Sequence, residues 1–227
     1  MWLRMTVRVG LLVLVALGCA PISGIPAPAP ARPGDPPGSG PAFRAAIRPA
    51  TRQELRYSWH RGCPVSWRRL RVIRLTHWGF DRRVHTGRLV VHRDAVRSMV
   101  AVMRGLFDRT YPIRRMRFVD AYGADDHRSM AADNTSAFNC RFVAGTSRWS
   151  EHAFGRAIDL NPVENPYVDG SHVSPPNGRP YADRSLRRRG MVHAGDAVVR
   201  LFARQDWGWG GSWTGARDYQ HFSASGR

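Results

Sequence analysis

The sequence predicts an α+β domain built on a small, mainly antiparallel sheet flanked by helices. Stretches with strand character and stretches with helix character do not alternate in the β-α-β rhythm that a parallel sheet would require. The composition allows a packed core, because 43% of the residues are hydrophobic and 10% aromatic, which excludes collagen-like, coiled-coil and wholly disordered chains. A length of 227 residues fits one such domain with a tail.

Two strands and one long helix come first along this domain. Residues 70–78 and 87–92 are rich in β-branched and apolar residues, which predicts two neighbouring strands or a hairpin. From Val96 to Phe107 the apolar residues recur at helical spacing, and Pro112 follows the helix end. The later elements are shorter: we expect a strand over 116–122, a helix over 125–132 begun by the Asp125-Asp126 pair, a loop over 133–145, a strand over 157–160, a helix over 196–204 and a closing strand over 219–222.

The amino-terminal region has the pattern of an export signal followed by a spacer. Residues 1–20 carry two arginines, an apolar run and small residues, which predicts a secretory signal peptide too short to span a bilayer. The sequence around Cys19 resembles a bacterial lipobox, which would make this cysteine a lipid anchor. Residues 21–42 are rich in Pro, Ala and Gly and predict an extended linker. We therefore expect a domain over 43–227 that is secreted or held at the cell envelope, with membrane contact only through the anchor.

The chain is strongly basic, because 35 basic residues against 17 acidic ones give a formal net charge of +18. The sequence contains no lysine, so all 35 basic residues are arginines. A GC-rich coding bias and selection for a polyanionic partner explain this equally well. The field would attract nucleic acid, anionic lipids or anionic cell-wall polymers. Export and the lack of a recognisable recognition element disfavour nucleic acid, which leaves wall polymers as the expected anionic partner.

The cysteines also fit export. If Cys19 is lipidated or removed with the signal, Cys63 and Cys140 remain as an even pair in an oxidising compartment. A disulfide between them would stabilise the fold by about 4 kcal/mol in the chain-entropy description. Two buried free thiols are the alternative.

Residues 150–162 carry the most informative chemistry. His152 and Asp159 are separated by Gly155, which permits a turn that brings both side-chain heads to one point. Asp159 lies in an apolar run, and a buried carboxylate requires a cation nearby. A metal ion satisfies that requirement, and so would the guanidinium of Arg156 or Arg141.

The segment 218–222 supplies a second histidine, His221, three residues after Asp218. Two histidines and one carboxylate that leave a fourth position open form a catalytic zinc site, and Zn²⁺ is the expected cofactor. A carboxylate that does not bind the metal must then act as general base, and Asp218 is the candidate. Residues three apart on a regular strand face opposite sides, so Asp218 must lie in a preceding turn or bulge.

These two segments resemble the VanY-type D-alanyl-D-alanine carboxypeptidases and the related L-alanyl-D-glutamate peptidases, a family of zinc metallopeptidases. The resemblance extends from about Cys63 to Phe222. It rests on the motif Ser150-x-His152-x-x-Gly155-x-Ala157-x-Asp159-Leu160-Asn161-Pro162, the closing Asp218-Tyr219-Gln220-His221-Phe222, Asn165-Pro166-Tyr167 and Trp207-Gly208-Trp209-Gly210-Gly211.

The resemblance implies the fold shared by hedgehog and D-alanyl-D-alanine peptidases, and a role for each motif residue. The metal ligands would be His152, Asp159 and His221, with Asp218 as general base. The segment Asn139-Cys140-Arg141 matches the family's arginine, so Arg141 would polarise the scissile carbonyl. Ser150 would support a ligand or cap the turn, and the tryptophans of 207–213 would line the substrate cleft or pack in the core.

The expected function is hydrolysis of an amide bond in peptidoglycan stem peptides by a monomeric enzyme. The sequence leaves open whether the enzyme is a D-alanyl-D-alanine carboxypeptidase or an L-alanyl-D-glutamate-type endopeptidase. A non-catalytic wall-binding module of the same fold is the alternative. Such a module would be expected to lose a ligand or the base, whereas all four positions here hold competent residues.

Overall fold

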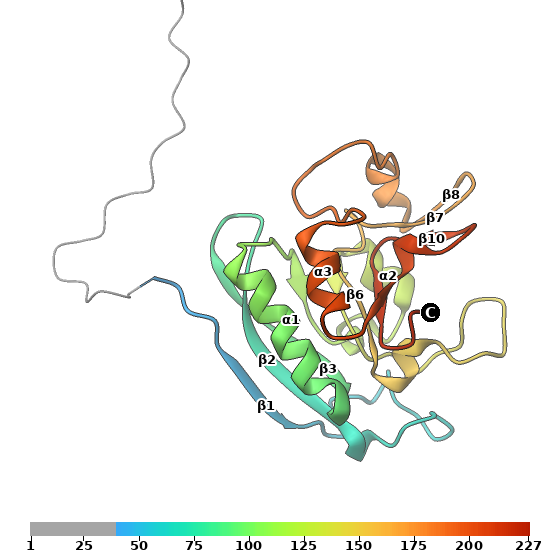
Figure 1. Cartoon of the computed structure of the whole chain (residues 1–227). Helices are drawn as coiled ribbons and strands as arrows, with labels where there is room; N and C mark the ends of the chain where they lie inside the picture. The colour runs from blue at the N-terminus through green and yellow to red at the C-terminus, as the bar shows by residue number, and fades with distance from the viewer. Residues whose placement is uncertain (1–39) are drawn as a thin grey trace, which may run out of the picture. The chain divides into compact units, whose positions relative to one another are not determined.

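The computed structural model describes residues 40–227 (Figure 1). The predicted signal peptide, Cys19 and most of the predicted linker lie outside these residues. Within the described part of the chain, no helix combines the length and the apolar character that a membrane span requires. Helices and short antiparallel strands are combined as the sequence predicts, so the α+β class is confirmed.

The largest sheet contains β1 (Ala45–Pro49), β2 (Leu70–Trp78) and β3 (Val84–His92) in that order, all antiparallel. The predicted pairing of β2 and β3 is confirmed, and β3 begins three residues earlier than expected. β1 was not predicted, because four of its five residues are exposed and Ile47 alone is strongly apolar. It pairs only with β2, as an edge strand.

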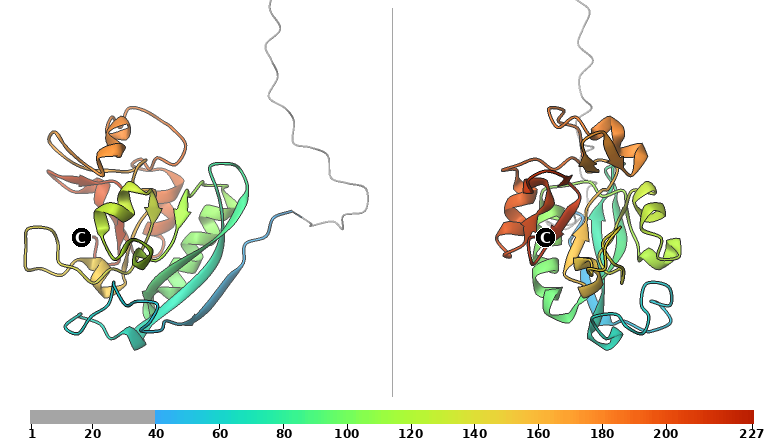
Figure 2. Two further views of the ribbon diagram at one scale, coloured as in Figure 1. Left: turned by 180° about the vertical axis from the view of Figure 1, so that it is seen from behind. Right: turned by 90° about the vertical axis from the view of Figure 1, so that its right-hand side faces the viewer.

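Apolar side chains cover both faces of this sheet. The helix α1 (Val96–Asp108) packs against one face, as the views in Figures 1 and 2 agree, and confirms the predicted helix. The core on this side includes Ile73, Leu75, Leu89, Met99 and Leu106. A smaller core on the other face includes Leu70, Val72, Val90, Leu55 and Phe138. The remainder of that second face carries exposed arginines.

A second antiparallel sheet positions the chemistry-bearing residues. It contains β6 (Ala157–Asp159), β11 (His221–Ser223) and β9 (Gly208–Trp209), with β11 in the centre. The helix α3 (Ala197–Ala203) packs on it, and the rings of Phe202 and Phe222 stack with centroids 3.8 Å apart. The predicted strand at 157–160 and helix at 196–204 are therefore confirmed, while the closing strand is shifted to 221–223.

The remaining elements are short. They are the parallel pair β4 (Arg115–Met116) and β5 (Asn134–Thr135), the antiparallel sheet of β10 (Arg217–Asp218), β7 (Tyr167–Asp169) and β8 (His172–Ser174), and the helix α2 (Asp126–Ala131). α2 confirms the predicted helix at 125–132, and the Asp125 side chain caps it by accepting from the Arg128 amide. The predicted loop at 133–145 was wrong at β5.

The strand predicted over 116–122 is also wrong beyond Met116. The chain forms a 3-10 helix at Val119–Tyr122 that ends at Gly123 in the left-handed region. Asp120 explains the difference, because its carboxylate accepts hydrogen bonds from the amides of Tyr57 and Ser58 and from the Ser58 hydroxyl. A long-range contact therefore overrides the local strand preference.

The predicted disulfide between Cys63 and Cys140 is present, with the two Cα atoms 5.9 Å apart. It joins the loop before β2 to the segment that carries Arg141. The amide of Cys140 also donates to the carbonyl of Ser58 at 3.0 Å. These links fix the Arg141 segment to the connection between β1 and β2.

Candidate metal centre

His152 is positioned by a tight turn. It lies in the 3-10 helix Glu151–Phe154, where the Ser150 hydroxyl caps the turn by accepting from the His152 amide. Gly155 ends the turn at φ 66°, in the left-handed region, and leads the chain into β6. A Cβ on Gly155 would lie 2.6 Å from the amide nitrogen of His92, so the close approach to β3 also requires glycine.

The turn and the strand pairing bring three side-chain heads together. In the pairing of β6 with β11, His221 lies directly opposite Asp159. Asp159 Oδ2 is 3.1 Å from His152 Nε2, and Asp159 Oδ1 is 3.2 Å from His221 Nδ1. The two imidazole nitrogens are themselves 3.2 Å apart, and all three residues are buried. The convergence expected from Gly155 and the closing segment is therefore present.

The outer ring nitrogens fix the orientation of both imidazoles. His152 Nδ1 donates to the carbonyl of Ala137, and His221 Nε2 donates to the main-chain oxygen of Arg227 at 2.9 Å. His152 Nε2 and His221 Nδ1 therefore turn toward the carboxylate of Asp159. Backbone acceptors of this kind orient histidine ligands in metal sites.

The electrostatics favour an ionised carboxylate between the histidines. Burial alone would raise the pKa of Asp159, but the charges and hydrogen bonds of His152 and His221 outweigh it and hold this pKa below its usual value. Burial would lower the pKa of His221, but its hydrogen bond to Asp159 together with the charges of Asp159 and Asp218 outweighs burial and raises this pKa.

The donor set fits a divalent metal. The three ligand atoms lie within 4.8 Å of one another, and two imidazoles with one carboxylate are the protein ligands of many catalytic zinc sites. His60, Cys63 and Cys140 also lie close together, but their two sulfur atoms form the disulfide. Of these two clusters, only the one around Asp159 has all its donor atoms available to bind a metal.

Asp218 reaches the same place from a different strand. It ends β10, which pairs with β7, and the chain then turns before β11 carries His221. Asp218 and His221 thus avoid the opposite faces of a single strand, as the sequence required. A Cβ on Gly210 would lie 2.6 Å from the Asp218 carbonyl oxygen, so the Trp-Gly-Trp-Gly-Gly segment leaves room for this close approach.

The carboxylate of Asp218 is poised to accept a proton. Its Oδ1 atom is buried and has no hydrogen-bond partner among residues 40–227. Burial, and after it the negative charge of Asp159, raises the pKa of Asp218 to about 6. A carboxylate with one buried, unpaired oxygen and a raised pKa beside a candidate metal site is typical of a general base.

Arg141 lies near this cluster but does not pair with Asp159. Its Nη2 atom forms an ion pair with Asp126 Oδ2 at 2.8 Å, and Arg156 pairs with Asp94. Within the described part of the chain, the charged partners of Asp159 are His152 and His221. The alternative in which an arginine neutralises Asp159 is therefore wrong.

Asp126 is a residue that sequence reasoning missed. It was interpreted as part of a helix start, yet Asp125 alone caps α2 and Asp126 holds the guanidinium of Arg141. The Asn139 amide lies 3.5 Å from the second carboxylate oxygen of Asp126. The Asn139 main-chain N–H donates to the carbonyl of His152, so the same segment connects Arg141 with the cluster. The sequence did offer one signal: a helix needs only one capping acid, so the second of the two adjacent acids, Asp126, was available for another role.

One cavity contains these side chains. It has a volume of about 810 Å³, and its lining includes Arg141, His152, Asp159, Asp218 and His221. Trp213 also lines it, whereas Trp207 and Trp209 are buried in the core. The tryptophan segment therefore serves both roles that the sequence left open.

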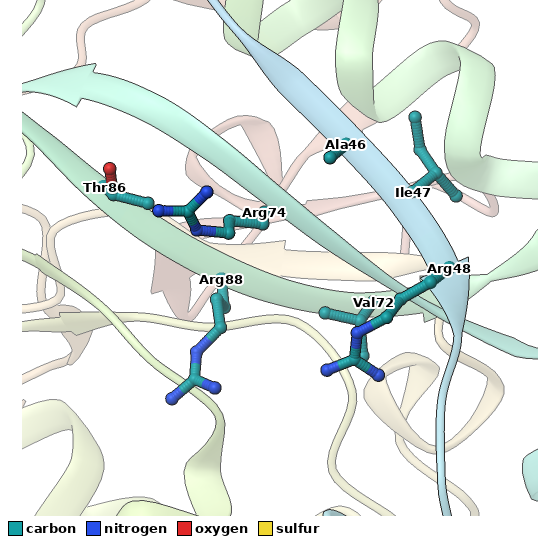
Figure 3. A pocket seen from close by; sticks show the side chains of 7 residues that line it. All are labelled: Ala46, Ile47, Arg48, Val72, Arg74, Thr86 and Arg88. Carbon is teal, nitrogen blue, oxygen red and sulfur yellow. The ribbon is translucent and has the colours of Figure 1, made fainter.

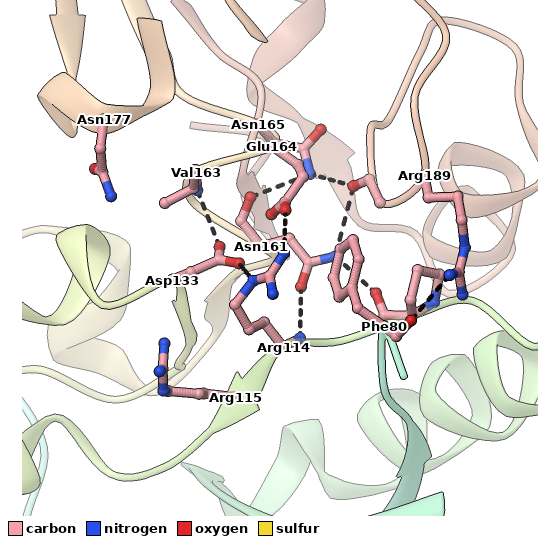
Figure 4. Close-up of polar contacts among 12 residues, drawn as sticks. Phe80, Arg114, Arg115, Asp133, Asn161, Val163, Glu164, Asn165, Asn177 and Arg189 are labelled. Atoms are coloured by element: carbon pink, nitrogen blue, oxygen red, sulfur yellow. Dashed lines mark hydrogen bonds and ion pairs between the residues drawn. The ribbon is translucent and has the colours of Figure 1, made fainter. Parts of the chain in front are cut away.

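A second buried carboxylate cluster follows Asp159 along the chain (Figure 4). Arg114 Nε donates to Asp133 at 2.8 Å and Arg114 Nη2 to Glu164 at 3.0 Å. Burial, and after it the charge of Asp133, raises the pKa of Glu164 to about 8. Nearby, the Asn165 side chain donates to the carbonyls of Leu160 and Gly190. This network holds the segment that leaves the Asp159 strand.

The comparison with protein families agrees with the geometry. Residues 144–224 match the model of a family described as D-alanyl-D-alanine carboxypeptidase. The resemblance found in the sequence is thereby confirmed over residues 144–224. The match includes His152, Asp159, Asp218 and His221. It begins at residue 144 and so does not include Arg141 or Asp126. It supports a peptidase, and hence a hydrolase, of this kind, from a family that is typically metal dependent.

Two further comparisons gave no match. Neither the search of curated proteins nor the search of solved structures found a significant relative. The functional assignment therefore depends on the family match and on the site itself.

Proposed function

We propose that the chain is a zinc-dependent peptidase that hydrolyses an amide bond in peptidoglycan stem peptides. The observation that carries the proposal is the convergence of His152, Asp159 and His221 beside the free carboxylate oxygen of Asp218, all within the matched segment. Two imidazoles and one carboxylate, with a separate acid nearby, form the donor and base set of zinc hydrolases. The family match supports the substrate class.

The chain's own residues account for binding, proton transfer and charge stabilisation. Zinc bound by the three ligands would supply a Lewis acid that lowers the pKa of a water molecule. Asp218 removes a proton from the attacking water, because its Oδ1 atom has no hydrogen-bond partner in the described part of the chain and its side chain lines the same cavity as the three ligands. The water oxygen bonds to the carbonyl carbon, the C–N bond breaks, and Asp218 returns the proton to the leaving amine.

Arg141 stabilises the carbonyl oxygen as negative charge develops on it. Its guanidinium lines the same cavity, where Nη2 pairs with Asp126 and Nη1 lies 3.4 Å from the carbonyl oxygen of Phe142. The Nε atom is buried without a hydrogen-bond partner in the described part of the chain. A fixed guanidinium acts in the transition state without reorganisation, which is the basis of oxyanion stabilisation.

The proposed place of action is the cell wall, reached through the predicted signal at 1–20 and linker at 21–42. The carboxypeptidase and the endopeptidase reactions both use the same ligands and base. The cavity can accommodate either substrate, because its lining includes Arg141, Arg148 and Arg227 for a terminal carboxylate and its 810 Å³ exceeds the needs of a dipeptide. The bond that is cut thus requires a direct assay.

The first test measures metal and cleavage together. The purified protein is assayed for zinc content and incubated with a pentapeptide ending in D-Ala-D-Ala and with intact peptidoglycan, before chelation, after it, and after zinc is restored. We expect cleavage to disappear with the metal and return with it. Release of terminal D-Ala assigns a carboxypeptidase, and an internal cut assigns an endopeptidase. A purified protein that contains no metal and whose cleavage activity is unchanged by chelators would contradict the proposal.

The second test removes the base. Asp218→Ala should retain zinc and lose cleavage by about 10²- to 10⁴-fold, which is the usual contribution of a general base. The metal content of the variant is the control, because the three ligands are unchanged. A variant with zinc bound and full activity would remove Asp218 from the reaction.

A further inference from the structure

A second depression lies on the outer face of the first sheet (Figure 3). It has a volume of about 410 Å³ and shares no lining residue with the metal-centre cavity. Residues from all three strands line it: Ala46, Ile47, Arg48, Val72, Arg74, Thr86 and Arg88. The Ile47 side chain points to the other face of the sheet, so three arginines surround Ala46, Val72 and the hydroxyl of Thr86 (Figure 3).

The strand register places like charges against one another. Arg74 in β2 lies directly opposite Arg88 in β3, and both side chains are exposed. Like charges at directly opposed positions destabilise a sheet. Within residues 40–227, neither arginine forms an ion pair with a carboxylate, whereas Arg48 pairs with Glu54. The guanidinium of Arg88 lies over the ring of Phe118, 4.9 Å from its centre.

The basic surface continues beyond this depression. A neighbouring depression includes Thr86 and Arg88 in its lining and adds Arg115 and Arg117. The two depressions therefore form one surface, which we call the arginine strip, defined by Arg48, Arg74, Arg88, Arg115 and Arg117. A continuous strip of separated charges fits a chain of anions better than a single small anion.

We propose that the arginine strip binds a polyanionic polymer whose repeating units carry phosphodiesters, of the kind found in bacterial walls. Guanidinium groups bind phosphate oxygens through paired hydrogen bonds, and an anion between Arg74 and Arg88 relieves their mutual repulsion. The residues that line the two depressions include no Phe, Tyr or Trp ring, and the imidazoles of His77 and His85 stack on each other, whereas single-stranded nucleic acid is held by stacking of its bases on aromatic rings. The predicted export of the chain also points to an envelope polymer.

The binding does not depend on peptide hydrolysis, so each can fail without the other. The probe is poly(glycerol phosphate), and affinity is measured at two salt concentrations. The test variant is Arg74→Ser/Arg88→Ser, and the matched control is Arg97→Ser/Arg187→Ser, which removes the same charge from two exposed arginines outside the strip. The test variant should bind about tenfold more weakly and with a smaller salt dependence, because counterion release falls with each lost phosphate contact.

A second variant guards against a folding defect. Arg74→Glu changes the charge by the same amount and can pair with Arg88 across the strands, so the sheet is retained. It should also lose about tenfold in affinity. Cleavage of a short soluble peptide by either strip variant should equal that of the unaltered protein.

Three outcomes overturn the proposal. Equal losses in the test and control variants would show that net charge alone attracts the polymer. Unchanged binding in both strip variants would place the contact elsewhere. Tighter binding of single-stranded DNA than of poly(glycerol phosphate) at equal phosphate concentration would identify a nucleic-acid surface instead.

Discussion

Two buried carboxylates lie five residues apart in one short segment and have opposite electrostatics. Asp159 is 4% exposed and Glu164 1%. Asp159 lies between two imidazoles, which hold its pKa below the usual value. Glu164 shares the single guanidinium of Arg114 with Asp133, and its pKa rises to about 8. Similar burial thus produces an ionised acid at one end of the segment and a proton-holding acid at the other.

The difference shows which kind of acid cluster can bind a metal. An imidazole neutralises a carboxylate and also offers a lone pair, whereas a guanidinium has five donors and no acceptor. The Asp159 cluster therefore presents ligand atoms to a cavity, while the Glu164 cluster is closed by hydrogen bonds and stabilises the chain. The neighbours decide the role: two imidazoles face Asp159, whereas Glu164 faces a second carboxylate, Asp133, and shares one guanidinium with it.

The largest effect should come from replacing Asp159, and replacement of Glu164 is the matched control. Asp159→Asn should lose bound zinc and reduce the rate of cleavage by more than about 100-fold. Loss of a hydrogen bond that only supports a metal ligand reduces activity by up to about 100-fold, and loss of a ligand itself should cost more. Glu164→Gln should retain both, because Glu164 contacts no ligand. Zinc content and the rate of peptide cleavage are the measurements. Equal zinc loss in both variants would remove the distinction between the clusters.

The candidate metal centre was predictable from sequence only in part from local features. Gly155 between His152 and Asp159 encodes a turn, whereas His221, 62 residues from Asp159, was found because the closing segment resembles a family motif. The arrangement around Glu164 was not predictable, since Arg114 and Asp133 belong to no motif that the sequence analysis recognised. Their pairing follows from tertiary packing, for which sequence spacing gives no signal.

The same reasoning applies to the fold. Long periodic elements such as β2 and α1 were predicted with nearly correct bounds, because repeated apolar residues mark one face of each. Strands of two or three residues such as β4, β7 and β9 are too short for any period. The strand expected over 116–122 was overridden by hydrogen bonds from Tyr57 and Ser58 to Asp120.

A smaller effect is expected from replacing Asp126, which acts on the candidate metal centre only through Arg141. Asp126→Asn removes the charge that fixes the Arg141 guanidinium and should slow cleavage about tenfold, since misplacing one stabilising group costs part of its contribution. Asp125→Asn is the matched control, because asparagine caps a helix as well as aspartate does. The loss should appear in kcat more than in KM.

A double-mutant cycle shows whether Asp126 acts through Arg141. In an Arg141→Ala background, Asp126→Asn should cause no further loss of rate. Additive losses would mean that Asp126 supports the fold or the substrate by another route. Circular dichroism of each variant separates that outcome from unfolding.

The smallest effect tests the sign of the Glu164 electrostatics. Its folded-state pKa of about 8 lies above the ordinary value of 4.5, so between these pH values the folded protein holds a proton that the unfolded chain has released. Rising pH therefore favours unfolding, and this contribution to stability is present below about pH 4.5 and lost toward pH 8.

The variant Glu164→Gln cannot release a proton at this position and should remove this part of the pH dependence of stability. The difference in thermal midpoint between the variant and the unaltered protein should grow by several degrees from pH 5 to pH 8, because each pH unit between the two pKa values changes the stability by about 1.4 kcal/mol and each kcal/mol shifts the midpoint by about 2–4 °C. Because His152, Asp159 and His221 are the same in both proteins, their own titration cancels in that difference. A constant difference across the range would mean that Arg114 keeps Glu164 ionised, as His152 and His221 keep Asp159.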